Sequence, residues 1–130
     1  MEEETIVLVA CAKGKRAEAS AAKDLYVSDW FRKARAYAEA TTDRWFILSA
    51  KHGLVEPDRV IAPYERTMRD LRAVQRHAWG RDVAIEIGRR ITAPSRVVFL
   101  CGSAYCDPVL EFVRYCTFKP LKIELPLDGL

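Results

Sequence analysis

A lysine and a histidine stand side by side in segment 49–54, Ser-Ala-Lys-His-Gly-Leu, which directly follows the apolar run 45–48. The loop that follows a buried strand is where α/β proteins commonly keep their functional groups. Lys51 and His52 can donate hydrogen bonds to an anion or to a developing negative charge, and His52 can also act as a general acid or base. Gly53 lets the backbone turn sharply or approach a ligand closely. Segment 49–54 therefore predicts a site for an anionic group.

A second group of candidates follows the first apolar run of the chain. Lys13 and Lys15 can hold a phosphate as point charges, although their loop has too few glycines for a Walker P-loop. Cys11, at the end of the same run, could be a nucleophile activated by His52 or by the lysines. The alternative is that Cys11 packs as a small buried side chain.

A third group lies in segment 63–67, Pro-Tyr-Glu-Arg-Thr. Tyr64 offers a ring that could stack on a base or sugar, Glu65 a carboxylate base, and Arg66 a guanidinium for a phosphate. The alternative is that the tyrosine packs the loop while Thr67 caps the next helix.

The loops after the predicted strands are expected to meet, because the loops after parallel strands share one edge of a sheet. These loops are segments 11–15, 49–54, 101–103 and 126–129. The same edge would bring in further binding candidates, which are Ser49, Gly53, Gly102 and Ser103. Asp128 joins Glu65 as a carboxylate that could position water or support an oxocarbenium ion. The alternative is that the glycines only end strands.

The elements that must position these groups follow from apolar patterning. The continuous run 5–10 predicts a strand covered on both faces, and the apolar run 45–48 predicts a second buried strand. Segment 96–100 predicts a third strand and segment 121–125 a short fourth strand. Helical spacing predicts a helix over 28–41, with Ser28 as its N-cap, and a second over about 67–91, as one helix or as two with a break at Trp79-Gly80. A third helix is expected to begin with Asp107 as N-cap and Pro108. Segment 56–63, with two prolines, is expected to be an irregular loop folding over the site.

This order predicts a single α/β domain over residues 1–130, with three layers and a four-stranded, mainly parallel sheet covered by helices on both faces. Four arginines recur at three- and four-residue spacing and could form a basic stripe for a nucleic-acid backbone: Arg66, Arg69, Arg72 and Arg76. Their alternative is an ordinary solvated helix face.

Composition limits the functional classes. The chain has 130 residues, of which 50% are hydrophobic, and a net charge of +3, which is compatible with a phosphate-bearing partner. No apolar stretch is long enough for a membrane span and the first residues are acidic, so we expect a cytoplasmic protein without a membrane partner. The four cysteines lack Cys-x-x-Cys spacing, so we expect thiols, no zinc and no cofactor.

The chain resembles a widespread, largely uncharacterised bacterial and phage domain family that is distantly related to the peroxide-stress protein YaaA. The resemblance rests on segments 11–15, 25–31, 48–54 and 63–67, and more loosely on Gly102, Tyr105 and 125–127. Members commonly have serine where Ala12 stands. The resemblance implies a nucleic-acid or nucleobase partner, because the YaaA-like group is linked to DNA binding and oxidative DNA damage, and related domains accompany enzymes of modified-guanine chemistry. The strand order is also similar to the uracil-DNA glycosylase architecture, although that family's His-Pro-Ser motif is absent.

The leading hypothesis is an enzyme that acts on a nucleic acid or nucleoside and cleaves or exchanges the N-glycosidic bond of a modified base. His52 and Lys51 would stabilise the departing base, Tyr64 would stack, and the lysines of segment 11–15 would hold phosphate. The alternatives are a non-catalytic nucleic-acid-binding module in DNA damage or phage defence, and a sensor of a small nucleotide.

Overall fold

Strand β1 (Glu4–Ala10) is the centre of the sheet in this computed structural model, which describes residues 3–12 and 14–127. The strand order is β4-β3-β1-β6-β7. β1 pairs in parallel with β3 (Trp45–Ser49) and β6 (Ser95–Leu100), and β6 pairs in parallel with β7 (Leu121–Glu124). The four predicted strands are therefore present. The sheet has a fifth strand, β4 (Gly53–Val55), which is antiparallel to β3.

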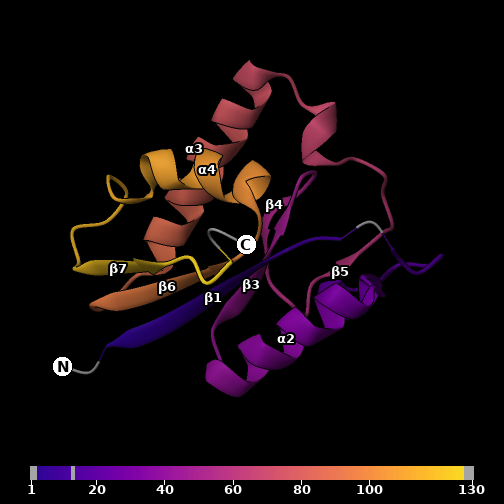
Figure 1. The fold of residues 1–130 in the computed structure, drawn as a ribbon, viewed down its shortest axis with the longest axis horizontal. Helices are drawn as coiled ribbons and strands as arrows, with labels where there is room; N and C mark the ends of the chain where they lie inside the picture. The colour runs from indigo at the N-terminus through magenta and orange to yellow at the C-terminus, as the bar shows by residue number, and fades with distance from the viewer. Residues whose placement is uncertain (1–2, 13, 128–130) are drawn as a thin grey trace.

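The sheet lies between two layers of helices, as the sequence predicts (Figure 1). α3 (Ala73–Arg90) and α4 (Ser103–Val113) cover one face, and α2 (Asp29–Thr41) covers the other. Alternate side chains of β1 serve the two cores, with Ile6 and Leu8 toward α3 and α4 and Val7 and Val9 toward α2. A strand that is covered on both faces needs apolar residues at every position, which explains the absence of alternation in this run.

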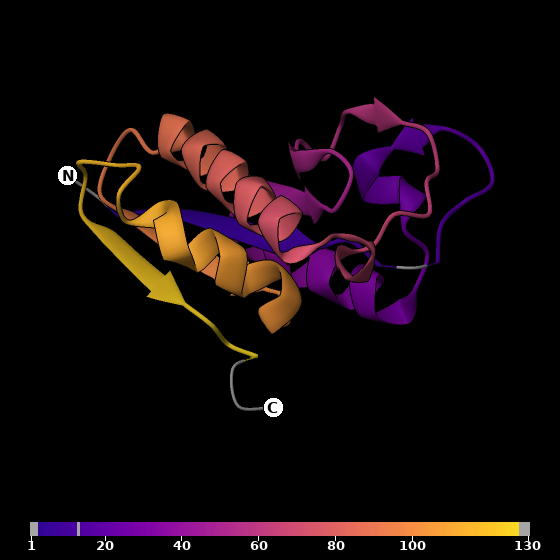
Figure 2. The same cartoon turned by 90° about the horizontal axis from the view of Figure 1, so that it is seen from above.

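A small two-stranded sheet lies at the end of the molecule away from the N-terminus (Figure 2). It pairs β2 (Ser20–Ala21) with β5 (Val60–Ile61), and the short helix α1 (Ala22–Leu25) follows β2. The expectation that segment 56–63 is wholly irregular is therefore wrong at β5. Its two prolines lie outside the paired residues, so neither removes a hydrogen bond from the ladder.

The predicted helix 67–91 is in fact a 3-10 turn, η1 (Met68–Asp70), followed by α3. The Asp70 carboxylate accepts hydrogen bonds from the backbone N–H and the hydroxyl of Thr67. These bonds cap η1 as a turn of its own, separate from α3. The break therefore precedes Ala73 rather than falling at Trp79-Gly80. Consequently the four predicted stripe arginines do not share one helix face, because only Arg76 lies within α3.

Gly80 lies within α3, at a place where this helix packs close to Pro108 of α4. A Cβ atom at Gly80 would lie 2.2 Å from the carbonyl oxygen of Pro108, so only glycine fits without a shift. Pro108 itself lies inside α4, which begins at Ser103 and not after Asp107 as predicted. The helix starts earlier because the Gly102 carbonyl already accepts from the N–H groups of residues 105 and 106.

Two further expectations meet the structure with opposite results. The N-cap at the start of α2 is confirmed, because the Ser28 hydroxyl accepts a hydrogen bond of 3.2 Å from the N–H of Phe31. The expectation of four thiols is wrong for Cys101 and Cys106, which form a disulfide between the end of β6 and the first turn of α4. Among the helices that the structure describes, none has both the length and the apolarity to cross a bilayer.

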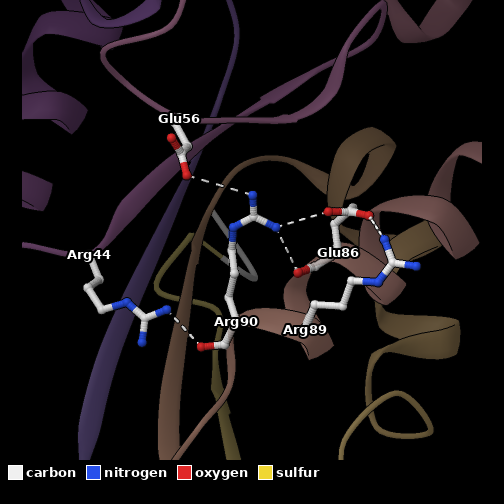
Figure 3. Close-up of polar contacts among 5 residues, drawn as sticks. All are labelled: Arg44, Glu56, Glu86, Arg89 and Arg90. Atoms are coloured by element: carbon white, nitrogen blue, oxygen red, sulfur yellow. Dashed lines mark hydrogen bonds and ion pairs between the residues drawn. The ribbon is translucent and has the colours of Figure 1, made fainter.

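An ionic network joins the end of α3 to Arg44, which precedes β3, and to Glu56, which follows β4 (Figure 3). The Arg90 guanidinium lies between the carboxylates of Glu86, at 3.0 Å, and Glu56, at 3.8 Å. Arg89 also pairs with Glu86, and Arg44 donates a 2.7 Å hydrogen bond to the Arg90 carbonyl. The network holds α3 against the sheet and neutralises the charge of Glu86.

Candidate functional site

Segment 49–54 forms the tight turn that joins β3 to β4. Gly53, which pairs with Ser49, has a φ of 73°, a left-handed conformation that side-chain-bearing residues rarely adopt. The Ser49 hydroxyl accepts hydrogen bonds from the backbone N–H groups of Lys51, at 3.3 Å, and His52, at 3.0 Å. Ser49 and Gly53 thus shape the turn, and only Lys51 and His52 extend polar side chains from it.

The Ser49 side chain is fully buried and begins a chain of hydroxyl groups. Its oxygen lies 2.7 Å from the hydroxyl of Tyr64, which lies 2.6 Å from the hydroxyl of Tyr26. Because the two backbone N–H groups occupy the lone pairs of the Ser49 oxygen, its hydrogen points to Tyr64. We infer that Ser49 donates to Tyr64 and Tyr64 donates to Tyr26.

Burial keeps this hydroxyl chain neutral. It raises the pKa of Tyr26 to about 12, and it raises the pKa of Tyr64 still further above the ordinary value. The Tyr64 ring lies between two other predicted site residues, with Lys15 Nζ 4.7 Å from its centroid and the His52 ring 5.5 Å away, edge to face. Tyr64 therefore holds the turn and the β1 loop together rather than presenting an open face for stacking.

A pocket of about 230 Å³, the cationic pocket, opens between the β1 loop, η1 and the first turn of α4. Its cationic side chains are those of Lys15, Arg66 and Arg69, and the described residues that line it include no aspartate or glutamate. Ala104 and Tyr105 belong to the first turn of α4, which contains no acidic residue. The N-terminal end of a helix carries a partial positive charge, so this turn adds to the attraction for an anion. The remaining lining residues are Cys11, Ala12, Thr67 and Met68.

Cys11 is half-buried in the wall of the cationic pocket. Its sulfur lies 3.2 Å from the hydroxyl oxygen of Tyr105. Burial is the largest cause that raises the pKa of Tyr105, and a negative charge on the sulfur would raise it further. Tyr105 therefore stays protonated and can donate to the Cys11 sulfur or to a ligand.

A second pocket of about 310 Å³, the hairpin pocket, lies between the β3–β4 turn and α3. It is lined by Lys51, His52, Gly53, Leu54, Trp79, Asp82, Val83 and Glu86. Burial lowers the pKa of His52 below 6.5, and the charges of Arg59 and Lys51 lower it further, so the imidazole is neutral at pH 7. A neutral imidazole can accept a proton, which is the state that a general base requires.

The structure sorts the predicted site residues into three groups. Cys11, Lys15 and Arg66 line the cationic pocket, and Lys51, His52 and Gly53 line the hairpin pocket. Ser49 and Tyr64 are buried between them. The remaining predicted residues are Glu65, Gly102 and Ser103, which are exposed and line neither pocket, and Lys13 and Asp128, which lie outside the described residues.

Several site residues were not predicted as such. Tyr26 and Tyr105 appeared in the sequence analysis only among the residues that carry the family resemblance. Arg69 was predicted only as part of a basic stripe on a helix. Asp82 and Glu86 stand four residues apart, a spacing that places them on one helix face. That spacing could have predicted a shared helix face. The two carboxylates lie beside Lys51 and His52, however, only because β4 packs beside α3.

Residues 6–130 match the sequence model of DUF6884, which is described as a family of unknown function. The chain belongs to this family. The DUF6884 match starts in β1 and includes every residue that lines the two pockets.

One curated relative of this DUF6884 chain is an uncharacterized protein, YfjM, of Bacillus subtilis (strain 168). The two are 42% identical over 41 residues, which is 32% of this chain and 27% of the relative. The similarity thus spans about a quarter of the relative's length. No solved structure matches the chain. Within residues 3–12 and 14–127, no three histidine, cysteine, aspartate or glutamate side chains gather in a group that could hold a metal ion.

Proposed function

We propose that this protein binds the phosphate group of a nucleotide or of a nucleic acid in the cationic pocket. One observation carries the proposal: Lys15, Arg66 and Arg69 converge with the first turn of α4 on one hollow, and no described carboxylate lines it. Cations and helix N-termini are the groups that proteins use to hold phosphates.

The size of the cationic pocket indicates that it encloses only part of a ligand. Its volume of about 230 Å³ is below the roughly 300–1,000 Å³ of pockets that enclose a whole small molecule. A phosphate with its sugar suits this space, and Met68 and Tyr105 supply apolar surface beside the cations. The resemblance to YaaA-like proteins agrees with a nucleotide or nucleic-acid ligand.

Cleavage of an N-glycosidic bond is our second candidate, and the hairpin pocket supports it. The pocket combines a neutral imidazole, the ammonium group of Lys51, and the carboxylates of Asp82 and Glu86. His52 could accept a proton from water while Lys51 stabilises the departing base. In this proposal Asp82 takes the place that sequence reasoning gave to Glu65, because Glu65 does not line the pocket.

Binding is tested with short single-stranded DNA that carries or lacks a 5′-phosphate, by fluorescence anisotropy over a series of salt concentrations. We expect tighter binding of the phosphorylated strand and a steep loss with salt. Arg69→Gln should weaken binding and flatten the salt dependence by about one unit of slope. Arg32→Gln, an exposed position on α2, is the matched control. Binding that does not weaken with salt, or an equal loss in the control, would contradict the proposal, whereas equal affinity for both strands would assign the pocket to an internal phosphate of the nucleic acid.

Catalysis is tested separately by mass spectrometry of bases released from modified DNA, RNA and nucleosides. Release that is lost in His52→Ala, with phosphate-dependent binding retained, supports the enzyme. Absence of release from every substrate, together with salt-sensitive binding, favours a binding module.

A further inference from the structure

The hairpin pocket and the cationic pocket are neighbours. The ring of Trp79, in the wall of the hairpin pocket, lies 5.8 Å from the ring of Tyr105, in the wall of the cationic pocket. A second connection passes through the Tyr64 ring, which is 5.5 Å from the His52 ring and 4.7 Å from Lys15 Nζ. His52 and Lys15 are therefore no farther apart than these two distances laid end to end. One nucleotide can bridge such a span.

The two carboxylates of the hairpin pocket differ in their partners. Glu86 is held by Arg89 and Arg90, and Arg90 is anchored in turn by Glu56 (Figure 3). Asp82 lies one helical turn earlier on α3, with 70% of its side chain exposed and a contact of 3.5 Å to Arg81. The Arg81 ion pair uses only Oδ1 of Asp82, which leaves the second oxygen, Oδ2, available to accept a hydrogen bond from a ligand.

The other walls of the hairpin pocket suit a planar ring. Trp79, Leu54 and Val83 supply apolar surface, and the indole is fixed because its N–H donates a 2.9 Å hydrogen bond to the Ser49 carbonyl. Lys51, on the turn that faces α3, can donate to a ring carbonyl. The pocket therefore offers an apolar wall, one cationic donor and one anionic acceptor.

We propose that the hairpin pocket binds the base of the nucleotide whose phosphate occupies the cationic pocket, and that it selects bases with an exocyclic amino group through Asp82. This inference rests on the proposed function, because it assumes a phosphate in the cationic pocket. A carboxylate accepts hydrogen bonds but cannot donate them, so it favours an amino group and repels a carbonyl oxygen at the same position. Cytosine has an amino group at C4 where uracil has a carbonyl oxygen, and N3 changes with it from an acceptor to an N–H donor, so the pair compares two hydrogen-bonding edges on rings of the same size.

The experiment measures the affinities of inorganic phosphate, cytidine monophosphate and uridine monophosphate by NMR titration of the isotope-labelled full chain. Three proteins are compared: wild type, Asp82→Asn, and the control Asp43→Asn, which makes the same change at an exposed position outside both pockets. Thermal melting and the reference NMR spectra establish that each variant is folded. We expect the wild type and Asp43→Asn to prefer the cytidine nucleotide by about threefold to tenfold, the effect of one ordinary net hydrogen bond, because water competes at this exposed carboxylate.

The outcomes separate this inference from the proposed function. A preference for cytidine that Asp82→Asn removes, with phosphate affinity unchanged, supports both. Equal affinity for the two nucleotides, or a preference that survives in Asp82→Asn, overturns base selection by Asp82 and leaves phosphate binding intact. Failure of phosphate and of both nucleotides to bind overturns the proposed function and this inference with it.

Discussion

Replacing Tyr64 by phenylalanine tests the hydroxyl chain that joins the turn to the rest of the site. The substitution removes one oxygen atom and with it the contacts of 2.7 Å to Ser49 and 2.6 Å to Tyr26. Each buried hydrogen bond contributes about 1 kcal/mol, and a buried partner that is left unsatisfied costs about 1–3 kcal/mol. Ser49 and Tyr26 are both almost fully buried, so water cannot replace the missing group. We therefore expect Tyr64→Phe to lower the free energy of unfolding by about 2–4 kcal/mol.

The measurement is urea denaturation followed by circular dichroism, with Tyr115→Phe as the matched control. Tyr115 is 88% exposed, so removal of its hydroxyl should change the free energy of unfolding by less than about 0.5 kcal/mol. A double-mutant cycle with Ser49→Ala should give a coupling energy of about 1 kcal/mol. If Tyr64→Phe is as stable as the control, the hydroxyl chain does not contribute as we describe.

Three other predictions concern titration and packing. The free energy of unfolding should fall by about 2–3 kcal/mol between pH 10 and pH 12, because Tyr26 ionises near 10.0 when unfolded and only at about 12 when folded; a flat denaturation profile over this range would refute it. The NMR titration of His52 should have its midpoint below 6.5, and the midpoint should rise in Arg59→Ala because a neighbouring positive charge is removed. Because the folded protein has the lower pKa, protonation favours the unfolded chain, and the free energy of unfolding falls as the pH drops below 6.5. A midpoint at or above 6.5 contradicts the proposed burial. Gly80→Ala should lower the free energy of unfolding by about 1–3 kcal/mol despite the better helix propensity of alanine, because the new Cβ would clash with Pro108. Gly14→Ala is the control in the same urea assay and should change the free energy of unfolding little, because its Cβ would lie 3.6 Å from the nearest atom.

Strands β1, β3 and β6 were predictable because burial on both faces leaves a pattern of mostly continuous apolar residues. Strand β4 was missed because three residues beginning with glycine carry no such pattern, and its pairing depends on the turn conformation of Gly53. The start of α4 was misplaced because Asp107-Pro108 is a good local start signal. The carbonyl of Gly102 had already begun the helix one turn earlier.

The sequence places Cys11 and Lys15 together in the segment that follows the first strand, and the structure finds both in the wall of one pocket. Side-chain direction was not predictable in the same way. Tyr64 was expected to present its ring to a ligand, but its hydroxyl fits between two buried hydroxyls that come from distant parts of the chain. The partners of the Lys51-His52 pair on α3 likewise depend on tertiary packing rather than on spacing in the sequence.

The turn between β3 and β4 also changes how its sequence motif should be used. Serine is required there to accept two backbone hydrogen bonds, and glycine is required for the positive φ of Gly53. Ser49 and Gly53 in Ser-Ala-Lys-His-Gly-Leu therefore determine the conformation of a turn and give no information about a substrate. Proteins that share the motif are expected to share this turn. A difference in reaction or ligand among them would appear as substitutions at Lys51, at His52 and on the surface of α3 that faces them.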